Sequence, residues 1–246
     1  MRLKTVVRDV RRFRNWREIN GKKSNLWKIR NPHLDLLLRD GTTDRWIARE
    51  IFFDKAYAKY FDVKKGDTVV DIGAHIGLFA LYAQSKGAAR IFAFEPNPAN
   101  FDALMQNISL NNVKNIRPLM VAIFPGLTST VFHIPTSKYK DRSSAFEIVK
   151  EAHEDIRVDC ISLDDFANRN DLKRIEFMKL DAEGAEHKIL AESNCMNTVQ
   201  KVVVEAHDID GHPKEEVEGQ LKRCGFHTKA VAAPTDGLTM YVYGWR

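Results

Sequence analysis

The stretch Asp67-Thr-Val-Val-Asp-Ile-Gly-Ala-His-Ile-Gly77 decides the fold of this 246-residue chain. Its apolar residues predict a buried parallel strand, and a helical pattern from Leu78 to Ala83 follows directly. Gly73 and Gly77 permit the close backbone approach that a tight strand-to-helix turn requires. Such a turn exposes backbone at the carboxyl end of the strand, where a nucleotide-like ligand can bind, although the turn alone is also compatible with a corner that binds nothing.

A second strand, Arg90-Ile-Phe-Ala-Phe-Glu95, ends in an acid eighteen residues beyond Gly77. A carboxylate in this position can accept hydrogen bonds from both hydroxyls of a ribose. The turn has two glycines where a dinucleotide fingerprint has three, and the chain has no Gly-x-x-x-x-Gly-Lys-Ser/Thr phosphate loop. An adenosyl ligand without a pyrophosphate therefore fits these residues best.

The composition indicates one substantial hydrophobic core, because 44% of the residues are apolar. We expect an N-terminal extension over residues 1–61 and one catalytic domain over residues 62–246. The sequence contains no apolar run of about 18 residues that could span a bilayer and no apolar signal-peptide segment. These features predict a cytoplasmic protein, and the three scattered cysteines are typical of reduced thiols.

The charge is distributed unevenly along the chain. Residues 1–30 contain 11 Lys and Arg against 2 Asp and Glu, a net charge of +9, so the remaining residues carry −4 of the total of +5. Apolar residues at helical spacing near the N-terminus predict a basic amphipathic helix. This helix can contact anionic lipid peripherally, RNA or an acidic partner, or it can pack on the domain with a solvated basic face.

Strands and helices alternate along the rest of the chain. This alternation predicts an α/β fold with a doubly wound, Rossmann-like, seven-stranded, mostly parallel sheet that ends in a C-terminal antiparallel hairpin. A polar stretch at 137–144, between short strands at 130–134 and 156–161, is a candidate cover for a substrate. The expected sheet strands are 67–72, 90–95, 116–123, 175–180, 199–205, 226–232 and 238–243, a further strand is 33–39, and the expected helices are 43–61, one from residue 76, 98–110, 163–168, 184–192 and 213–224.

Several motifs then give a family resemblance across residues 64–246. Together with the glycine turn, Phe94-Glu-Pro96, Ser162-Leu-Asp164, Met178-Lys-Leu-Asp-Ala-Glu-Gly-Ala-Glu186 and Val204-Glu-Ala-His207 resemble the FkbM-type family of class I S-adenosylmethionine-dependent methyltransferases. The resemblance implies O-methylation of a hydroxyl on a sugar, glycolipid, polyketide or related metabolite. It also implies S-adenosyl-L-methionine as the methyl donor and no required metal.

The expected cofactor contacts surround the first two strand ends. We expect Glu95 to bind the ribose hydroxyls and His75 to cover the cofactor rather than react with it. The other expected contacts are Asp71, Gly73, Ala74 and Gly77 for the amino-acid and ribose portions, Pro96 and Asn97 for the adenine side, and Val121 and Ala122 for the adenine itself by their place in the fold.

Two pairs of ionisable residues mark the expected catalytic edge. Asp181 and Glu183 follow the fourth strand, and Glu205 and His207 have the same spacing at the fifth, so both pairs can face one cleft. His207 is our favoured general base, with Asp181 and Glu183 orienting substrate or cofactor. For Glu186, a favourable charge at a helix N-terminus is the preferred interpretation. A divalent ion bound by these acids is the less favoured alternative.

Two other functions remain open from the sequence. RNA methylation is the first, because the basic arm carries Phe13, Trp16 and Trp27, which could stack on bases while arginines contact phosphates. The chain has no Pro-Pro pair, however, and so lacks the Pro-Pro-aromatic tetrad used by methyltransferases of nucleobase amino groups. The second is a non-catalytic module that binds the cofactor and attaches to a membrane through the arm.

Overall fold

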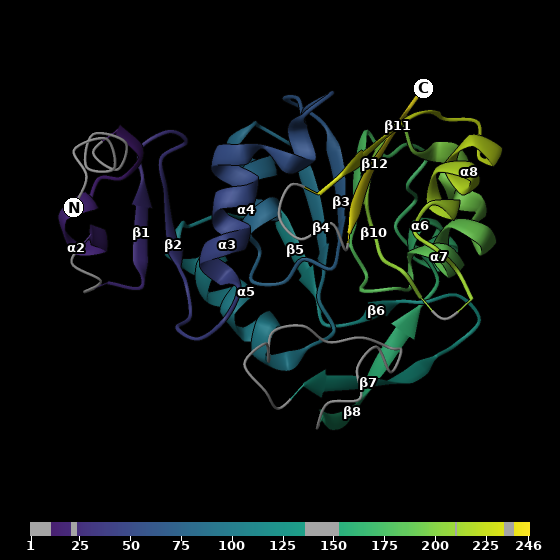
Figure 1. Ribbon diagram of the computed structural model, residues 1–246, viewed down its shortest axis with the longest axis horizontal. Helices are drawn as coiled ribbons and strands as arrows, with labels where there is room; N and C mark the ends of the chain where they lie inside the picture. Colours follow the sequence, from purple (N-terminus) through teal and green to yellow (C-terminus); the bar gives the residue numbers. More distant parts are fainter. Residues whose placement is uncertain (1–10, 21–23, 136–152, 210, 234–238) are drawn as a thin grey trace.

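The computed structural model describes residues 11–20, 24–135, 153–209, 211–233 and 239–246. Within these residues a seven-stranded sheet has the order β11-β12-β10-β9-β3-β4-β5, and β12 runs antiparallel to both of its neighbours (Figure 1). All other neighbouring pairs are parallel. The strands are β3 (Thr68–Ile72), β4 (Arg90–Phe94), β5 (Ile116–Leu119), β9 (Phe177–Leu180), β10 (Lys201–Ala206), β11 (His227–Ala232) and β12 (Met240–Trp245). The predicted doubly wound sheet with its C-terminal hairpin is confirmed.

Helices cover both faces of this sheet, as a right-handed parallel topology requires (Figure 1). Alternate residues of each central strand enter opposite cores: Val69 packs with the helices of one face, whereas Val70 packs with those of the other. The first face carries α3 (Asp44–Arg49), α4 (Leu78–Ser85) and α5 (Pro98–Leu110), and the second carries α6 (Leu163–Arg169), α7 (Glu186–Glu192), the 3-10 helix Asn194–Thr198 and α8 (Glu216–Arg223). None of the helices in the described ranges is long and apolar enough to cross a membrane.

The single helix predicted over residues 43–61 is wrong. α3 continues into a π-helical turn, Glu50–Asp54, and Lys55 with φ 55° separates this turn from a 3-10 turn, Ala56–Ala58. Ile51 and Tyr57 are both buried, yet six residues of a regular helix would point them about 120° apart. The break lets both side chains face the same core.

The N-terminal region forms a strand pair of which the sequence predicted one member, the strand over 33–39. β1 (Leu26–Ile29) pairs with β2 (Leu34–Leu37), and α2 (Trp16–Asn20) precedes them. Phe13 and Trp27 are 3% and 6% exposed, and their rings contact each other at 4.9 Å. These two side chains are therefore core residues and are not available to stack on bases. Most of the predicted amphipathic helix lies outside the described residues.

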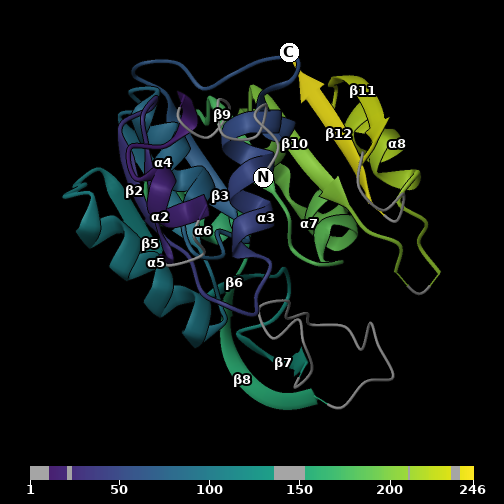
Figure 2. The same cartoon turned by 60° about the vertical axis from the view of Figure 1, so that its left-hand side comes forward.

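After β5 the chain forms a small three-stranded sheet that is separate from the main one. The strand predicted over 116–123 is divided there, because β5 ends at Leu119 and β6 (Ala122–Ile123) instead pairs with β8 (His153–Ile161). β7 (Ser129–Pro135) pairs with the other edge of β8, and this sheet lies at one end of the molecule (Figure 2). The polar stretch at 137–144 and the turn at 234–237 lie outside the described residues.

Candidate functional site

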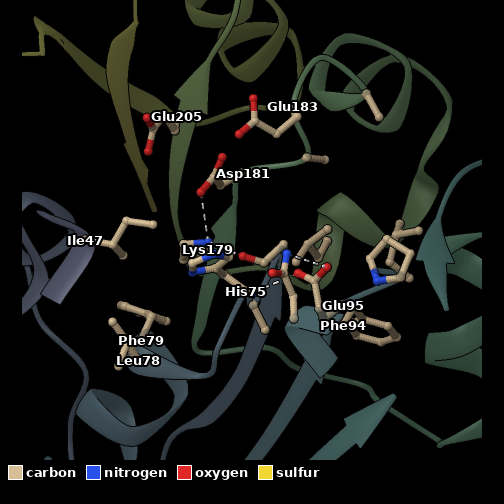
Figure 3. Close-up of a pocket in the computed structure, with 18 of the residues that line it drawn as sticks. Ile47, His75, Leu78, Phe79, Phe94, Glu95, Lys179, Asp181, Glu183 and Glu205 are labelled. Atoms are coloured by element: carbon tan, nitrogen blue, oxygen red, sulfur yellow. Dashed lines mark hydrogen bonds and ion pairs between the residues drawn. The ribbon is translucent and has the colours of Figure 1, made fainter. Parts of the chain in front are cut away.

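A cavity of about 560 Å³ opens at the carboxyl ends of β3, β4, β9 and β10. This is the place where parallel α/β sheets bind ligands, because the strand ends and helix N-termini converge there. Figure 3 shows Glu95 on one side of the cavity and three acidic side chains, Asp181, Glu183 and Glu205, on the other, with His75 and Lys179 between them. The cavity therefore has two chemically different ends.

The glycine turn after β3 forms part of the cavity wall. Gly73 has φ 76°, and a Cβ added to it would lie 1.7 Å from the backbone oxygen of Asp181. The N–H groups of Gly73 and Ala74 both donate to the Phe94 carbonyl, at 3.0 and 2.8 Å. The turn is therefore held against β4 and β9 at a separation that only glycine permits.

Glu95 lies at the end of β4 and lines the cavity, although it is only 5% exposed. Its carboxylate accepts hydrogen bonds from the backbone N–H groups of His75 (2.8 Å) and Asn97 (3.0 Å) and from the Asn100 side chain (3.3 Å). Burial raises the pKa of this carboxyl above its usual value, although His75 and these donors act to lower it. The side chain is thus oriented before any ligand binds.

Lys179 is a buried cation that connects the ends of β3 and β9. Its Nζ lies 2.8 Å from the Gly73 carbonyl oxygen, 3.4 Å from Asp71 and 3.2 Å from Asp181. Asp71 is fully buried, and burial raises its pKa to about 6 although Lys179 opposes the shift. The sequence signal for this pairing was a lysine inside the apolar strand Phe177–Leu180, because a buried lysine needs an anionic partner.

Replacing this cation should weaken the fold measurably. We expect Lys179→Met to lower the free energy of unfolding by about 3–5 kcal/mol, because two acids lose their buried counter-charge. Urea denaturation at pH 7.5 measures this loss. Lys173→Met is the matched control, since its pair with Asp171 is exposed, and its midpoint should equal that of the wild type. Equal midpoints for both variants would show that Lys179 is not needed for stability.

Two carboxyl groups at the other end of the cavity share a tyrosine. The Tyr57 hydroxyl lies 2.6 Å from Glu205 and 3.4 Å from Asp181. Burial and the adjacent Asp181 raise the pKa of Glu205 to about 8. Burial also acts to raise the pKa of Asp181, but Lys179 and His207 outweigh it, and the pKa of Asp181 falls below its usual value. Near neutral pH, Asp181 is the ionised member and Glu205 is poised to exchange a proton.

His207 is held by two acids from the first turn after β9. Its Nδ1 lies 3.1 Å from Glu186, and its Nε2 lies 3.6 Å from Glu183. Burial acts to lower the pKa of His207, but Glu186, Glu183 and Glu205 raise it well above 6.5. A ring that is already protonated at neutral pH cannot accept a proton, so this environment disfavours the predicted role of His207 as general base.

Glu186 does more than place a charge at a helix N-terminus. It is fully buried and accepts hydrogen bonds from the backbone N–H groups of Ala182 (2.7 Å) and Gly184 (2.8 Å). The same carboxylate contacts the ring of His207, so it orients that ring. Glu183 adopts a left-handed φ of 47° in this turn. Donor atoms of Asp181, Glu183 and His207 lie within 4.8 Å of one another, an arrangement that could hold a divalent ion.

The structure brings most of the predicted site residues to one cavity. Asp71, Gly77, Asn97 and His207 do not line it: Asp71 is buried against Lys179, Gly77 is the N-cap of α4, and Asn97 caps α5 by accepting a hydrogen bond from the Ala99 N–H at 2.9 Å. The predicted residues that do line it are Gly73, Ala74, His75, Glu95, Pro96, Val121, Ala122, Asp181, Glu183 and Glu205.

Sequence reasoning missed the wall contributed by residues 42–57. Glu50 accepts a short hydrogen bond from Tyr241, and burial raises its pKa. Trp46 is 51% exposed at the cavity. These residues carry no recognisable motif, and only the tertiary packing of α3 and the turns that follow it places them beside the strand ends.

Comparison with known proteins agrees with this architecture. Residues 71–228 match the methyltransferase FkbM domain family. A protein named Methyltransferase 1 from Beauveria bassiana is 32% identical over 68% of this chain and 74% of its own length. The 31-O-demethyl-FK506 methyltransferase FkbM of Streptomyces tacrolimicus is 26% identical over 77% of this chain and 84% of its own.

A third relative and a solved structure extend this comparison. Hexuronic acid methyltransferase AglP of Haloferax volcanii is 25% identical over 82% of this chain and 84% of its own. The structure of precorrin-6y C5,15-methyltransferase from Geobacter metallireducens superposes with a TM-score of 0.50 at 14% identity, covering 89% of this chain and 97% of that one, which shows a shared fold. Because residues 71–228, well over half of its sequence, match this domain, the chain belongs to the FkbM family of S-adenosylmethionine-dependent methyltransferases.

Proposed function

We propose that this protein transfers the methyl group of S-adenosylmethionine to a hydroxyl of a neutral sugar, glycolipid or related metabolite. The observation that carries the proposal is the charge of the cavity. Five carboxyl groups line it, from Glu50, Glu95, Asp181, Glu183 and Glu205. Among the described lining residues the basic side chains are His75 and Lys179, and Lys179 is already surrounded by acids. Such a wall favours a cationic cofactor and hydroxyl groups and disfavours phosphates.

The cofactor is assigned to the end of the cavity near the glycine turn. Glu95 is oriented to accept hydrogen bonds from the ribose hydroxyls, and the amino-acid portion of the cofactor can approach the backbone of Gly73 and Ala74 closely. Val121 and Ala122 offer apolar contact for the adenine. Asp71 does not contact the cofactor in this assignment. It pairs with Lys179, which in turn donates a hydrogen bond to the Gly73 carbonyl in the glycine turn.

The acceptor is assigned to the end near Asp181 and Glu205. Carboxylates accept hydrogen bonds from sugar hydroxyls, and the exposed indole of Trp46 provides a flat apolar surface for a sugar ring. The name of the Streptomyces relative specifies methylation at an oxygen, and that of the Haloferax relative specifies a hexuronic acid. A hexuronic acid carries a carboxylate, which this acidic wall would repel, so a neutral acceptor fits this chain better.

Methyl transfer needs alignment and removal of one proton. Bound S-adenosylmethionine supplies a sulfonium methyl group that the acceptor oxygen attacks in line, breaking the carbon–sulfur bond. Glu205 in its ionised form takes the hydroxyl proton. Asp181 stays ionised and orients the hydroxyl. Protonated His207 helps to keep Asp181 ionised, because its positive charge lowers the pKa of Asp181.

The pH dependence distinguishes the two possible bases. Glu205 is protonated below a pKa of about 8 and ionised above it, and only the ionised form accepts a proton, so kcat/KM should rise with pH through about 8. His207 lowers the pKa of Glu205, so His207→Ala should move this rise to higher pH and recover activity there. Steady-state rates from pH 6 to 10 measure both profiles. A variant inactive at every pH would return the base role to His207.

The substrate class is tested by transfer of labelled methyl into fractionated host extract. Label in glycan, lipid or small-metabolite fractions, absent with Glu205→Gln, is the expected result. Label confined to RNA would support the alternative in which residues 1–30 bind RNA. Cofactor binding without label in any fraction would support a non-catalytic module.

A further inference from the structure

A cluster of two histidines and a glutamate lies outside the cavity, where the loop after β10 meets α7 and α8. A ring nitrogen of His187, a ring nitrogen of His212 and a carboxylate oxygen of Glu216 lie within 4.8 Å of one another. None of the three lines the cavity described above. The two rings are 5.5 Å apart between centroids and tilted by 31°.

His187 is the informative member, because one of its nitrogens is buried without a hydrogen-bond partner. The side chain is 5% exposed, and its Nε2 lies 3.1 Å from the backbone carbonyl oxygen of His207. A carbonyl only accepts hydrogen bonds, so Nε2 carries the proton and Nδ1 of the neutral ring holds a lone pair. This Nδ1 is buried and makes no hydrogen bond.

A buried acceptor without a donor is costly, and native proteins usually satisfy it. Metal-binding histidines commonly donate their other ring N–H to a backbone carbonyl, which fixes the tautomer and raises ligand basicity. His187 has this arrangement toward the His207 carbonyl. The orphaned nitrogen and the adjacent His212–Glu216 pair, whose Nδ1 and Oε2 are 3.2 Å apart, thus have one common explanation.

We propose that His187, His212 and Glu216 form a binding site for a divalent transition-metal ion, with zinc as the best match. Two imidazoles and one carboxylate are a donor set that zinc accepts, with water in the fourth position. In a tetrahedral site with bonds of about 2.1 Å the donors are about 3.4 Å apart, so donor atoms within 4.8 Å of one another need to move together by at most about 1.4 Å per pair. His212 and Glu216 have side chains 58% and 47% exposed and can make this adjustment.

The site would fasten the loop after β10 to two helices. His187 is in the first turn of α7 and Glu216 begins α8, whereas His212 lies in the loop between β10 and α8. The backbone and side-chain nitrogens of Lys214 both donate to Asp208 in this loop, and the backbones of Ile209 and His212 exchange two hydrogen bonds. Because His187 also holds the His207 carbonyl, a bound ion would fix the backbone of the residue whose ring contacts Glu186 and Glu183.

Zinc binding to the purified full-length chain, with any affinity tag removed, tests this proposal. His212→Ala is the decisive variant because this side chain is exposed and its loss should not disturb folding. His133→Ala is the matched control, since the half-buried His133 and the exposed His153 and Asp155 form another such cluster on the small sheet. Isothermal titration should show one fewer zinc ion bound by His212→Ala than by the wild type, and His133→Ala should retain the site formed by His187, His212 and Glu216.

Thermal unfolding gives a second readout that does not depend on methyl transfer. Zinc at about one hundred times its Kd should raise the midpoint of the wild type and of His133→Ala by about 5–10 °C. His212→Ala and Glu216→Gln should lose most of this rise. Unchanged zinc stoichiometry and an unchanged midpoint shift in His212→Ala would overturn the proposal, whatever the outcome for the methyl-transfer activity.

Discussion

Glu205→Gln is expected to lower kcat by about 10²–10⁴-fold, the contribution typical of a positioned general base. The amide keeps the size of the side chain and can still accept a hydrogen bond from the Tyr57 hydroxyl, now 2.6 Å from Glu205, but it cannot accept a proton. The cofactor end of the cavity is unaltered, so the Kd for S-adenosylmethionine should stay within about threefold of the wild type, a difference of less than about 0.7 kcal/mol.

Single-turnover rates and calorimetric cofactor titration separate these two effects. Glu192→Gln, an exposed residue at the end of α7, is the control for the chemical change itself and should behave as the wild type. A Glu205→Gln protein with near-normal kcat would exclude Glu205 as the base. If kcat and cofactor affinity fell together, Glu205 would be a cofactor contact, and the two ends of the cavity would need to be reassigned.

Gly73→Ala is expected to destabilise the fold more than a methyl group added at any other position in the site. The new Cβ would lie 1.7 Å from the backbone oxygen of Asp181, which no side-chain rotation can relieve. Either the turn leaves the β9 edge or the backbone before Glu183 shifts, and both movements disturb the cofactor end and the acidic end together. We expect a loss of more than about 4 kcal/mol, and so a midpoint at least about 8 °C lower.

Gly126→Ala separates this steric clash from backbone strain. Gly126 has φ 77°, almost the same as Gly73, but a Cβ added there would meet nothing within 4 Å. Its variant therefore measures the strain of a left-handed alanine alone. Calorimetry of both variants gives the comparison, and equal midpoints would show that the contact with Asp181 relaxes at little cost. If Gly73→Ala does not yield soluble protein while Gly126→Ala does, the expectation is met in its strongest form.

Local pattern was sufficient for the central strands β3 and β4. Val69, Val70 and Ile72 form a continuous apolar strand, and the positions of Gly73 and Glu95 follow from strand ends that the sequence marks clearly. α5 has the predicted bounds, 98–110, because Asn97 caps it and Pro98 begins it. The C-terminal hairpin was equally readable from two apolar runs around a turn signal.

The catalytic side was only half predictable. Period-two spacing identified Asp181, Glu183 and Glu205, because neighbouring parallel strands bring their ends together. It did not identify Tyr57, which is 148 residues from its partner Glu205 and lies in a segment predicted to be one regular helix. Sequence reasoning also assigned Glu186 to a helix terminus, although its buried contact with His207 determines which protonation state that histidine adopts.

Sequence by itself determined the family, the order of the elements and which acids reach the sheet edge, because these depend on periodicity and on contacts between residues near in sequence or on adjacent strands. Tertiary structure alone decided which acid can take a proton. The pKa of Glu205 reflects burial and Asp181, whereas that of His207 reflects three acids from two different segments. The pKa shift of a group is the sum of its burial and of its interactions with all charges close to it in space. Residues that are neighbours in the sequence supply only part of that sum, so a local sequence pattern cannot predict it.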